Sequence, residues 1–191
     1  KKKNPEALLD LGEIYESGVG VEKNYKKAKE YYELSAQLNH IEAYKKLGDF
    51  YYYGRGGEPD ISKAKKNFEL AIKMNDPEVF YKLGVIYQYG EPINYEKSLQ
   101  YYEFAAKMNY SNALFQIGRM YSNGEGVRQD YSKAKEYYEK AAKLDNSSAL
   151  NNLGYMYLEG HGVKKNYLKA KEYYELAAKL NNTSSIYSLG Y

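Results

Sequence analysis

The residues that could take part in catalysis or metal binding are few, and their spacing limits what they could do. The chain has no cysteine, which excludes thiolate nucleophiles, disulfides and cysteine-built zinc sites. Its two histidines, His40 and His161, lie far apart in the sequence, so no histidine metal site is expected. Loops such as Gly160–Val163 are not phosphate-binding loops, because no strand precedes them and no Gly-Lys-Ser/Thr follows. The sequence therefore predicts no catalytic residue, no metal and no cofactor.

The charge and hydropathy of the chain argue against two classes of partner. Its 191 residues include 28 Lys and Arg and 25 Asp and Glu, a net charge of +3. Nucleic-acid-binding proteins usually concentrate basic residues on one face, which this small surplus does not suggest. Apolar runs are only a few residues long, too short to cross a bilayer. Lys1-Lys2-Lys3 is not followed by an apolar stretch, so no signal peptide is expected there, and the compartment stays open.

The elements that must position any site come from an internal repeat. A Leu-Gly or Ile-Gly pair returns at steps of 36, 36, 34, 36 and 36 residues. In the first five units, a tyrosine lies three residues after this glycine, and a second glycine lies three residues after the tyrosine. An aromatic doublet and then two small residues come near the end of each unit, and in the second unit the doublet is Asn67-Phe68. The chain therefore holds five units and the first helix of a sixth. The repeated pairs are Leu11-Gly12, Leu47-Gly48, Leu83-Gly84, Ile117-Gly118, Leu153-Gly154 and Leu189-Gly190.

Each unit is predicted to form two helices. In the first unit these cover about Pro5–Ser17 and Tyr25–Leu38, because apolar residues recur at helical spacing and glycines separate the two segments. In each unit, an Asn or Asp precedes the second helix and is expected to cap it. Another Asn or Asp follows this helix and is expected to adopt a left-handed conformation. The third unit has a loop two residues shorter, Gly90–Asn94, and we expect the stacking of the helices to survive this deletion. The caps are Asn24, Asp60, Asn94, Asp130 and Asn166; the terminating residues are Asn39, Asn75, Asn109, Asp145 and Asn181.

The pattern resembles the Sel1-like repeat, a relative of the tetratricopeptide repeat. The fifth unit carries nearly all of its signature: Leu153-Gly154, Tyr157, Gly160-His161-Gly162-Val163, Lys169-Ala170, Tyr173-Tyr174 and Ala177-Ala178. The second and third units depart from it at Asp60-Ile61, Ser98 and the short loop. The resemblance implies an all-α, right-handed superhelical α/α solenoid. As one domain over 1–191, it would have repeats at 5–40, 41–76, 77–110, 111–146 and 147–182 and a partial one at 183–191.

The resemblance also implies a non-catalytic adaptor that binds a protein or peptide on its concave face. A single hairpin cannot bury both of its apolar stripes, whereas stacked hairpins can. A glycine inside a helix costs roughly 0.5–1 kcal/mol relative to alanine, so the repeated glycines need a packing reason. We expect them to let the two helices approach, and expect Gly84→Leu or Gly154→Leu to lower thermal stability sharply.

The aromatic residues divide into a repeating and a non-repeating set. Tyrosines that recur in every unit, such as Tyr15 and Tyr157, are expected in the core. By analogy with tetratricopeptide repeats, the first helix of each unit lines the concave face. Along this face, from the first unit to the fifth, the composition changes from acidic to aromatic and then to Asn-rich. Such a surface suits a peptide, because rings supply contact area and amides pair with its backbone. The predicted partner-binding residues are Tyr52, Tyr53, Tyr81, Val85, Tyr89, Asn112, Phe115, Arg119, Asn151 and Tyr155.

Four alternatives remain open from the sequence. Several of these rings could instead pack between neighbouring first helices. The chain could be a spacer in a longer protein, and a terminal repeat without a polar cap could self-associate. Cysteine-rich relatives have been associated with β-lactam binding, but the disulfides of that branch are missing here.

Overall fold

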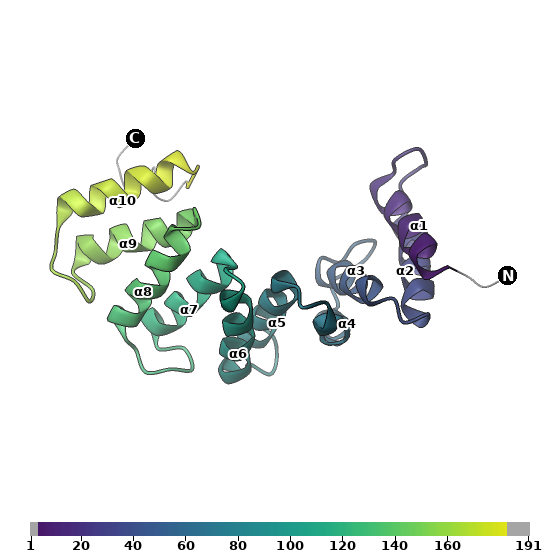
Figure 1. Cartoon of the computed structure of the whole chain (residues 1–191), viewed down its shortest axis with the longest axis horizontal. Coiled ribbons are helices and arrows are strands. Elements are labelled where there is room, and N and C mark those ends of the chain that lie inside the picture. The colour runs from purple at the N-terminus through teal and green to yellow at the C-terminus, as the bar shows by residue number, and fades with distance from the viewer. Residues whose placement is uncertain (1–3, 183–191) are drawn as a thin grey trace. The chain divides into compact units, whose positions relative to one another are not determined.

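The computed structural model describes residues 4–182, and these form helices joined by short loops (Figure 1). The sixth first helix predicted at 183–191, and with it the expected terminal self-association, lies outside the described residues. Within the described part, the all-α prediction is confirmed. The helices are α1 (Pro5–Ser17), α2 (Tyr25–Gln37), α3 (Ile41–Tyr52), α4 (Ile61–Ala71), the 3₁₀ turn η1 (Ile72–Met74), α5 (Pro77–Tyr89), α6 (Tyr95–Lys107), α7 (Ser111–Asn123), α8 (Tyr131–Ala142), α9 (Ser147–Glu159) and α10 (Tyr167–Lys179).

The predicted helix boundaries are set by side-chain caps. Asn24 precedes α2 and its side chain accepts a hydrogen bond from the Lys27 amide at 3.0 Å, and the equivalent residue does the same before α4, α6, α8 and α10. This satisfies an amide that would otherwise lack a partner at a helix start. After the second helices, Asn39 and its counterparts adopt positive φ between 52° and 59°, as predicted. Local sequence therefore fixes where each second helix starts and stops.

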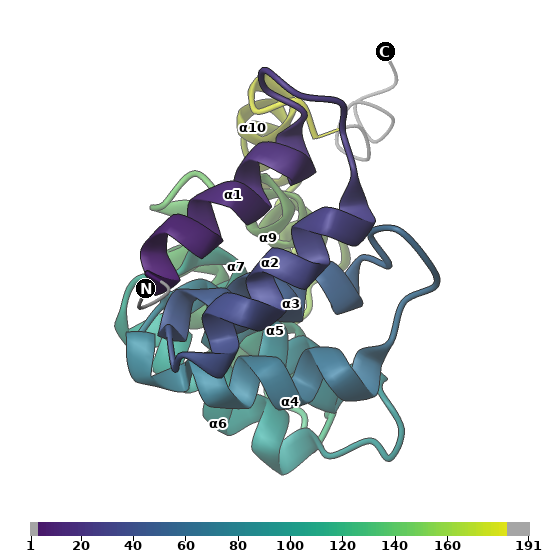
Figure 2. The same cartoon turned by 90° about the vertical axis from the view of Figure 1, so that its right-hand side faces the viewer.

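The chain divides into two compact units, and the boundary falls in the shortened third loop, between Gly90 and Glu91. In the amino-terminal unit, α1 packs on α2, α2 on α3, α3 on α4 and α4 on α5 (Figures 1 and 2). In the carboxy-terminal unit the same order runs from α6 to α10. That the five repeats behave as one domain stays a prediction.

The pairing of the repeated glycine with the aromatic doublet has a packing cause. The first helix presents its glycine to the second aromatic of the doublet, so that Gly48 faces Phe68, and Gly118 faces Tyr138. A Cβ atom on Gly48 would lie 2.5 Å from the Phe68 ring, and one on Gly118 would lie 2.6 Å from the Tyr138 ring. The glycine thus makes room for a ring, which is more specific than the close approach of helices expected from the sequence. The rings that face these glycines are buried: Tyr32, Phe68, Tyr138 and Tyr174.

Of the five tyrosines that follow the glycine by three residues, Tyr87 is 6% exposed and lies in the core as predicted. The other four, Tyr15, Tyr51, Tyr121 and Tyr157, lie at the edge of the core, which corrects the expectation for them. Tyr15, Tyr121 and Tyr157 are half-buried and stack face to face on the first aromatic of the doublet, with ring centroids 5.6 to 5.8 Å apart. A lysine from the first turn of the second helix covers the outer side, as Lys27 does at 4.9 Å from the Tyr15 centroid. Stacking on one side and a cation on the other let these rings stay partly open to solvent.

Candidate functional site

In the amino-terminal unit, the structure brings three of the predicted binding residues together on α3 and α5. Tyr52 is half-buried, with its ring 5.0 Å from Tyr53 and 6.4 Å from Phe68. Burial raises the pKa of the Tyr52 hydroxyl, and the neighbouring hydroxyls of Tyr53 and Tyr81 raise it further. Tyr52, Tyr53 and Tyr81 therefore form one aromatic group, which we call the α3–α5 aromatic cluster.

Tyr53 is the most accessible ring of this cluster. Its side chain is 54% exposed, and two cations lie against the ring: Arg55 and Lys82, each 5.4 Å from the centroid. Tyr89, at the end of α5, is also 54% exposed, whereas Val85 is partly buried. The unit thus offers two tyrosines that are each 54% exposed, and one of them, Tyr53, contacts the half-buried ring of Tyr52.

In the carboxy-terminal unit, the predicted residues take up separate contacts. Exposed Asn112 accepts a hydrogen bond from the Asn146 amide at 3.0 Å. Phe115 is half-buried, tilted against Tyr138 at 5.8 Å, and packs against the core, which corrects the expectation that it faces solvent. The reason is its position one turn before Gly118, on the same side of α7. Arg119 is partly buried and donates to the side-chain oxygen Oε1 of Gln116 at 3.2 Å, and Asn151 is partly buried on α9.

Tyr155 is half exposed and contacts a histidine that sequence reasoning had set aside. His161 stacks on Tyr131 at 4.9 Å and meets Tyr155 edge-on at 5.5 Å. His161 lies in a loop between two glycines, and this short loop brings its side chain back against Tyr131 of α8 and Tyr155 of α9. His161 is therefore a partly buried packing residue beside Tyr155.

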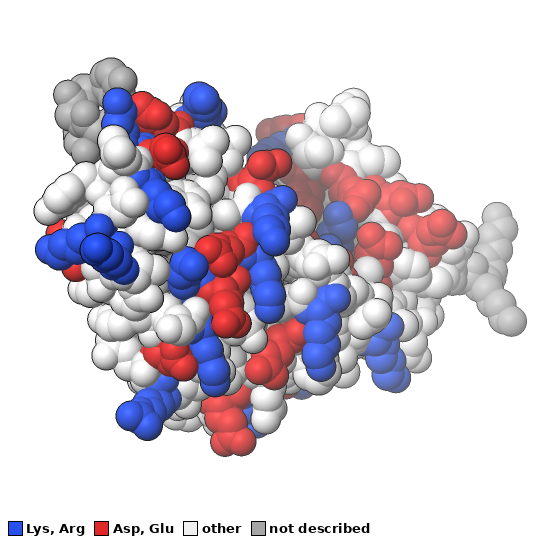
Figure 3. Space-filling view, turned by 60° about the vertical axis from the view of Figure 1, so that its left-hand side comes forward, with Lys and Arg blue, Asp and Glu red and all other residues white. Residues whose placement is uncertain are grey.

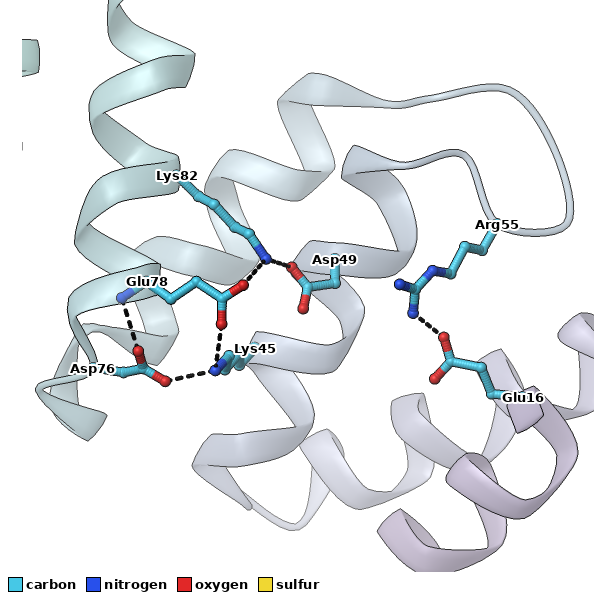
Figure 4. Close-up of polar contacts among 7 residues, drawn as sticks. All are labelled: Glu16, Lys45, Asp49, Arg55, Asp76, Glu78 and Lys82. Atoms are coloured by element: carbon cyan, nitrogen blue, oxygen red, sulfur yellow. Dashed lines mark hydrogen bonds and ion pairs between the residues drawn. The ribbon is translucent and has the colours of Figure 1, made fainter. Parts of the chain in front are cut away.

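A network of ion pairs crosses the first helices of the amino-terminal unit (Figure 4). Lys45 on α3 pairs with Asp76 at 2.6 Å and with Glu78 at 3.0 Å. Lys82 on α5 pairs with Glu78 at 2.8 Å and with Asp49 on α3. Anions and cations of α3 and α5 thus alternate, and they hold α3 and the start of α5 together.

Two further ion pairs join α1 to α3 and the loop that follows it. Glu16 accepts from Arg55 and also from the Tyr32 hydroxyl at 2.5 Å, while Glu13 pairs with Lys46. Burial raises the pKa of that hydroxyl, and the hydrogen bond to Glu16 raises it further. The acidic end expected for this surface is therefore largely neutralised by cations from the next repeat. Sequence reasoning missed these partners because they lie about one repeat away.

The repeat assignment is independently supported by a family model. The Sel1 repeat model matches residues 5–40, 41–76, 81–110, 111–146 and 147–182. The chain belongs to the Sel1 repeat family. Proteins built from Sel1 repeats are generally non-catalytic protein-interaction scaffolds with an all-α solenoid fold.

Solved Sel1 repeat structures resemble the chain along most of its length. A Sel1 repeat protein from Oxalobacter formigenes is 33% identical with a TM-score of 0.84, covering 98% of this chain and 77% of its own. A protective antigen of uropathogenic Escherichia coli is 29% identical with a TM-score of 0.86, and the match covers 95% of this chain and 39% of that one. Cysteine-rich protein B of Helicobacter pylori is 31% identical with a TM-score of 0.54, over 66% of this chain and 92% of that one. No curated protein matches the chain significantly.

Two serine–lysine spacings in the second helices of the Sel1 repeats were overlooked in the sequence. Ser62 and Lys65 in α4, and Ser132 and Lys135 in α8, match the Ser-x-x-Lys spacing of penicillin-binding enzymes. Lys135 is held by Glu139 at 3.1 Å, and this hydrogen bond raises the pKa of Lys135, the opposite of what a general base requires. Lys65 lies 4.3 Å from the centroid of Tyr87. The pairing of Lys135 with Glu139 therefore argues against its activating Ser132.

One face of the Sel1 repeats (Figure 3) mixes charges of both signs, and the described residues hold no cluster of metal ligands. On the face drawn in Figure 3, Lys and Arg side chains are interspersed with Asp and Glu. Among residues 4–182, no three His, Asp or Glu side chains gather in a way that could hold a metal ion. None of the helices over the same residues combines the length and the apolar character needed to cross a membrane.

The ion-pair network predicts how stability depends on pH. The hydrogen bond from Lys82, aided by Lys45, holds the pKa of the Glu78 carboxyl below its usual range despite partial burial. A carboxyl with a lowered folded-state pKa stabilises the protein above its unfolded-state pKa, about 4.3 for Glu, and this contribution is lost as pH falls through the folded-state pKa. We expect the urea midpoint of the amino-terminal unit to fall below about pH 4.5 in the wild type and to fall less in Glu78→Gln.

Glu96→Gln serves as the control for this titration. Glu96 is an exposed residue of α6 and makes no ion pair within residues 4–182. Its variant should follow the wild-type pH profile across the acid range. Identical slopes for the wild type and Glu78→Gln would contradict a stabilising role of the Glu78 pairs.

Proposed function

We propose that this Sel1 repeat protein is a non-catalytic scaffold that binds a peptide or a partner domain on the face formed by its first helices, the concave face in the family resemblance. The observation that carries the proposal is the α3–α5 aromatic cluster: Tyr53 is 54% exposed, flanked by Arg55 and Lys82, and supported from below by Tyr52. An exposed ring on a packed base presents contact area without losing much conformational entropy when it binds.

The charges around the ring suit a polypeptide. Lys82 is buried and already paired with Asp49 and Glu78, so the charges that a partner can reach here are those of Arg55 and Glu78, whose side chains are 37% and 39% exposed. Such a surface can pair with both the donors and the acceptors of a peptide backbone while the tyrosine ring contacts a side chain. In the carboxy-terminal unit, half-exposed Tyr155 and exposed Asn112 offer the same two kinds of contact.

The test replaces the open tyrosines and leaves the packed rings in place. Tyr53, Tyr89 and Tyr155 are each at least half exposed, whereas truncating Phe115 would also disturb the core. Peptides are selected on the wild-type protein from a display library of random dodecapeptides and are then measured by fluorescence anisotropy. Because an interface aromatic can contribute about 2 kcal/mol, we expect Tyr53→Ala/Tyr89→Ala/Tyr155→Ala to weaken these peptides by tenfold or more.

The matched control removes apolar surface elsewhere. Tyr167 and Leu168 begin α10, a second helix, and are 67% and 75% exposed. Tyr167→Ala/Leu168→Ala should bind the selected peptides like the wild type, and both variants should melt near the wild-type temperature. Undiminished binding to the folded tyrosine variant would place the binding surface elsewhere.

A further inference from the structure

A groove on the second helices of the carboxy-terminal unit combines an apolar floor with a cationic rim. It has a volume of about 570 Å³ and is lined by residues of α6, α7 and α8. Leu114 and Ile117 of α7 and Leu144 after α8 contribute to its apolar lining. This volume is within the range of pockets that bind ligands. The rim of the groove belongs to second helices, and the groove is therefore distinct from the surface proposed above.

Three lysines and one glutamate line this groove. Lys107 comes from α6, whereas Lys140 belongs to α8 and Lys143 follows it as the C-cap; Glu103 is the single anion. None of these four makes an ion pair within residues 4–182, in contrast to Lys45 and Lys82 of the amino-terminal unit. Lys107 and Lys140 instead lie over aromatic rings, 5.6 Å from the Phe104 centroid and 5.0 Å from the Tyr137 centroid. The cations of the groove thus outnumber its anion, and no ion pair neutralises them.

Lys140 is the residue that sets this groove apart from its counterparts in other repeats. It lies two residues after the buried aromatic of the doublet, a position that carries an apolar residue in the other four repeats: Leu34, Leu70, Phe104 and Leu176. The Sel1 hairpin therefore folds without a lysine at this position. The next groove, lined by Leu153, Tyr173 and Lys143, belongs to a repeat with Leu176 in place of Lys140.

We propose that this groove, the α6–α8 groove, binds an acidic amphipathic peptide segment of a partner protein. Apolar side chains of the peptide would pack on Leu144, which is 41% exposed and lies in the same groove as the buried Leu114 and Ile117, and its carboxylates would pair with the lysines. The cations come from both walls, Lys107 from one and Lys140 with Lys143 from the other. A ligand must therefore carry separate carboxylates on both sides of an apolar body. A peptide with Asp or Glu around Leu or Phe has this arrangement, whereas a fatty acid has a single carboxylate.

The decisive variant replaces the lysines by residues that other repeats of the chain already use. Lys140→Leu copies Leu34, Leu70 and Leu176, and Lys143→Gln copies Gln37, so the double variant Lys140→Leu/Lys143→Gln should fold like the wild type. Random dodecapeptides are selected on the wild type, with this double variant for counter-selection, and the enriched peptides are measured by fluorescence anisotropy. We expect the enriched peptides to combine Asp or Glu with Leu, Ile or Phe. They should bind the double variant at least tenfold more weakly than the wild type, and their binding to the wild type should weaken when NaCl is raised from about 50 to about 300 mM.

Two further variants control for net charge and for position. Lys164→Leu removes a charge from an exposed loop residue of the same unit and should bind as the wild type does. Leu176→Lys moves the distinguishing lysine into the next groove and should create a second site. The tyrosine triple variant should bind these peptides normally, so failure of the first-helix proposal would be seen separately. Selection of neutral or basic peptides, equal binding to the double variant, or Lys140-dependent binding of oleate without any acidic peptide would overturn the proposal.

Discussion

Gly118→Leu is expected to lower the free energy of unfolding of the carboxy-terminal unit by about 3 kcal/mol or more. A Cβ atom at this position would lie 2.6 Å from the Tyr138 ring and 3.2 Å from the Ala134 carbonyl oxygen. The ring has little room to move aside, because it is only 2% exposed and packs in the core with Leu114, Ala134 and Leu153. The added side chain must therefore separate α7 from α8. Urea denaturation followed by circular dichroism measures the loss, and hydrogen exchange of the α7 and α8 amides locates it.

Gly57→Leu is the matched control for this substitution. Gly57 lies in an exposed loop, its φ is outside the left-handed region, and a Cβ atom there meets nothing within 4 Å. Its variant should unfold within about 0.5 kcal/mol of the wild type. The double variant Gly118→Leu/Tyr138→Ala should lose less stability than the two single changes added together, because the truncated ring vacates the space that leucine needs. Wild-type melting of Gly118→Leu would refute this account of the repeated glycine.

Gly154→Leu, anticipated from the sequence, should have a smaller effect of the same kind. The Cβ atom would meet the Tyr174 ring at 2.8 Å, and the three nearest atoms all belong to that side chain, with no backbone atom among them. A side chain can turn away more easily than a carbonyl group. The order of the two losses therefore tests whether the contact distance at the glycine, rather than helix propensity, determines the cost.

The parts of the fold that were predicted from the sequence are those fixed by short-range chemistry. The capping residue Asn24 and the left-handed Asn39 act within a few residues of their own positions, so their types and spacing suffice to place the helix ends. The position of the glycine in each first helix was predicted from the repeat itself. Its partner ring did not, because both residues of the doublet Tyr31-Tyr32 are aromatic, and only the stacking of Tyr31 on Tyr15 shows which one turns inward.

The candidate site was harder to predict because its contacts join different repeats. Lys82 and Asp49 are 33 residues apart, and no local pattern indicates that they meet. The outward face of the first helix was also assigned too broadly. Phe115 precedes Gly118 by one helical turn and so shares its buried side, whereas Tyr155 follows Gly154 directly and stays half exposed. Burial at these positions depends on the neighbouring helix, which the sequence of one helix does not specify.

Lys82→Met is expected to destabilise the amino-terminal unit by about 2–4 kcal/mol. Lys82 is 5% exposed, and the side chain of Asp49 is 15% exposed. Burial alone would lower the pKa of Lys82, but hydrogen bonds to Asp49 and Glu78 raise it above its ordinary value, so the lysine is charged at neutral pH. Methionine keeps most of the apolar stem but leaves the Asp49 carboxylate poorly hydrated and without its cation. The loss is measured by urea denaturation at neutral pH.

The control and the rescue separate this electrostatic cost from a packing defect. Lys46 pairs with Glu13 at a more open site, with side chains 29% and 45% exposed, so Lys46→Met should cost less than about 1 kcal/mol. Lys82→Met/Asp49→Asn should recover part of the stability, because the buried anion is removed together with its cation. Equal losses for Lys46→Met and Lys82→Met, or no recovery in the double variant, would contradict the assignment. Because Lys82 also lies 5.4 Å from the Tyr53 centroid, the same ion pairs fix the cation beside the most open ring of the α3–α5 aromatic cluster before any partner arrives.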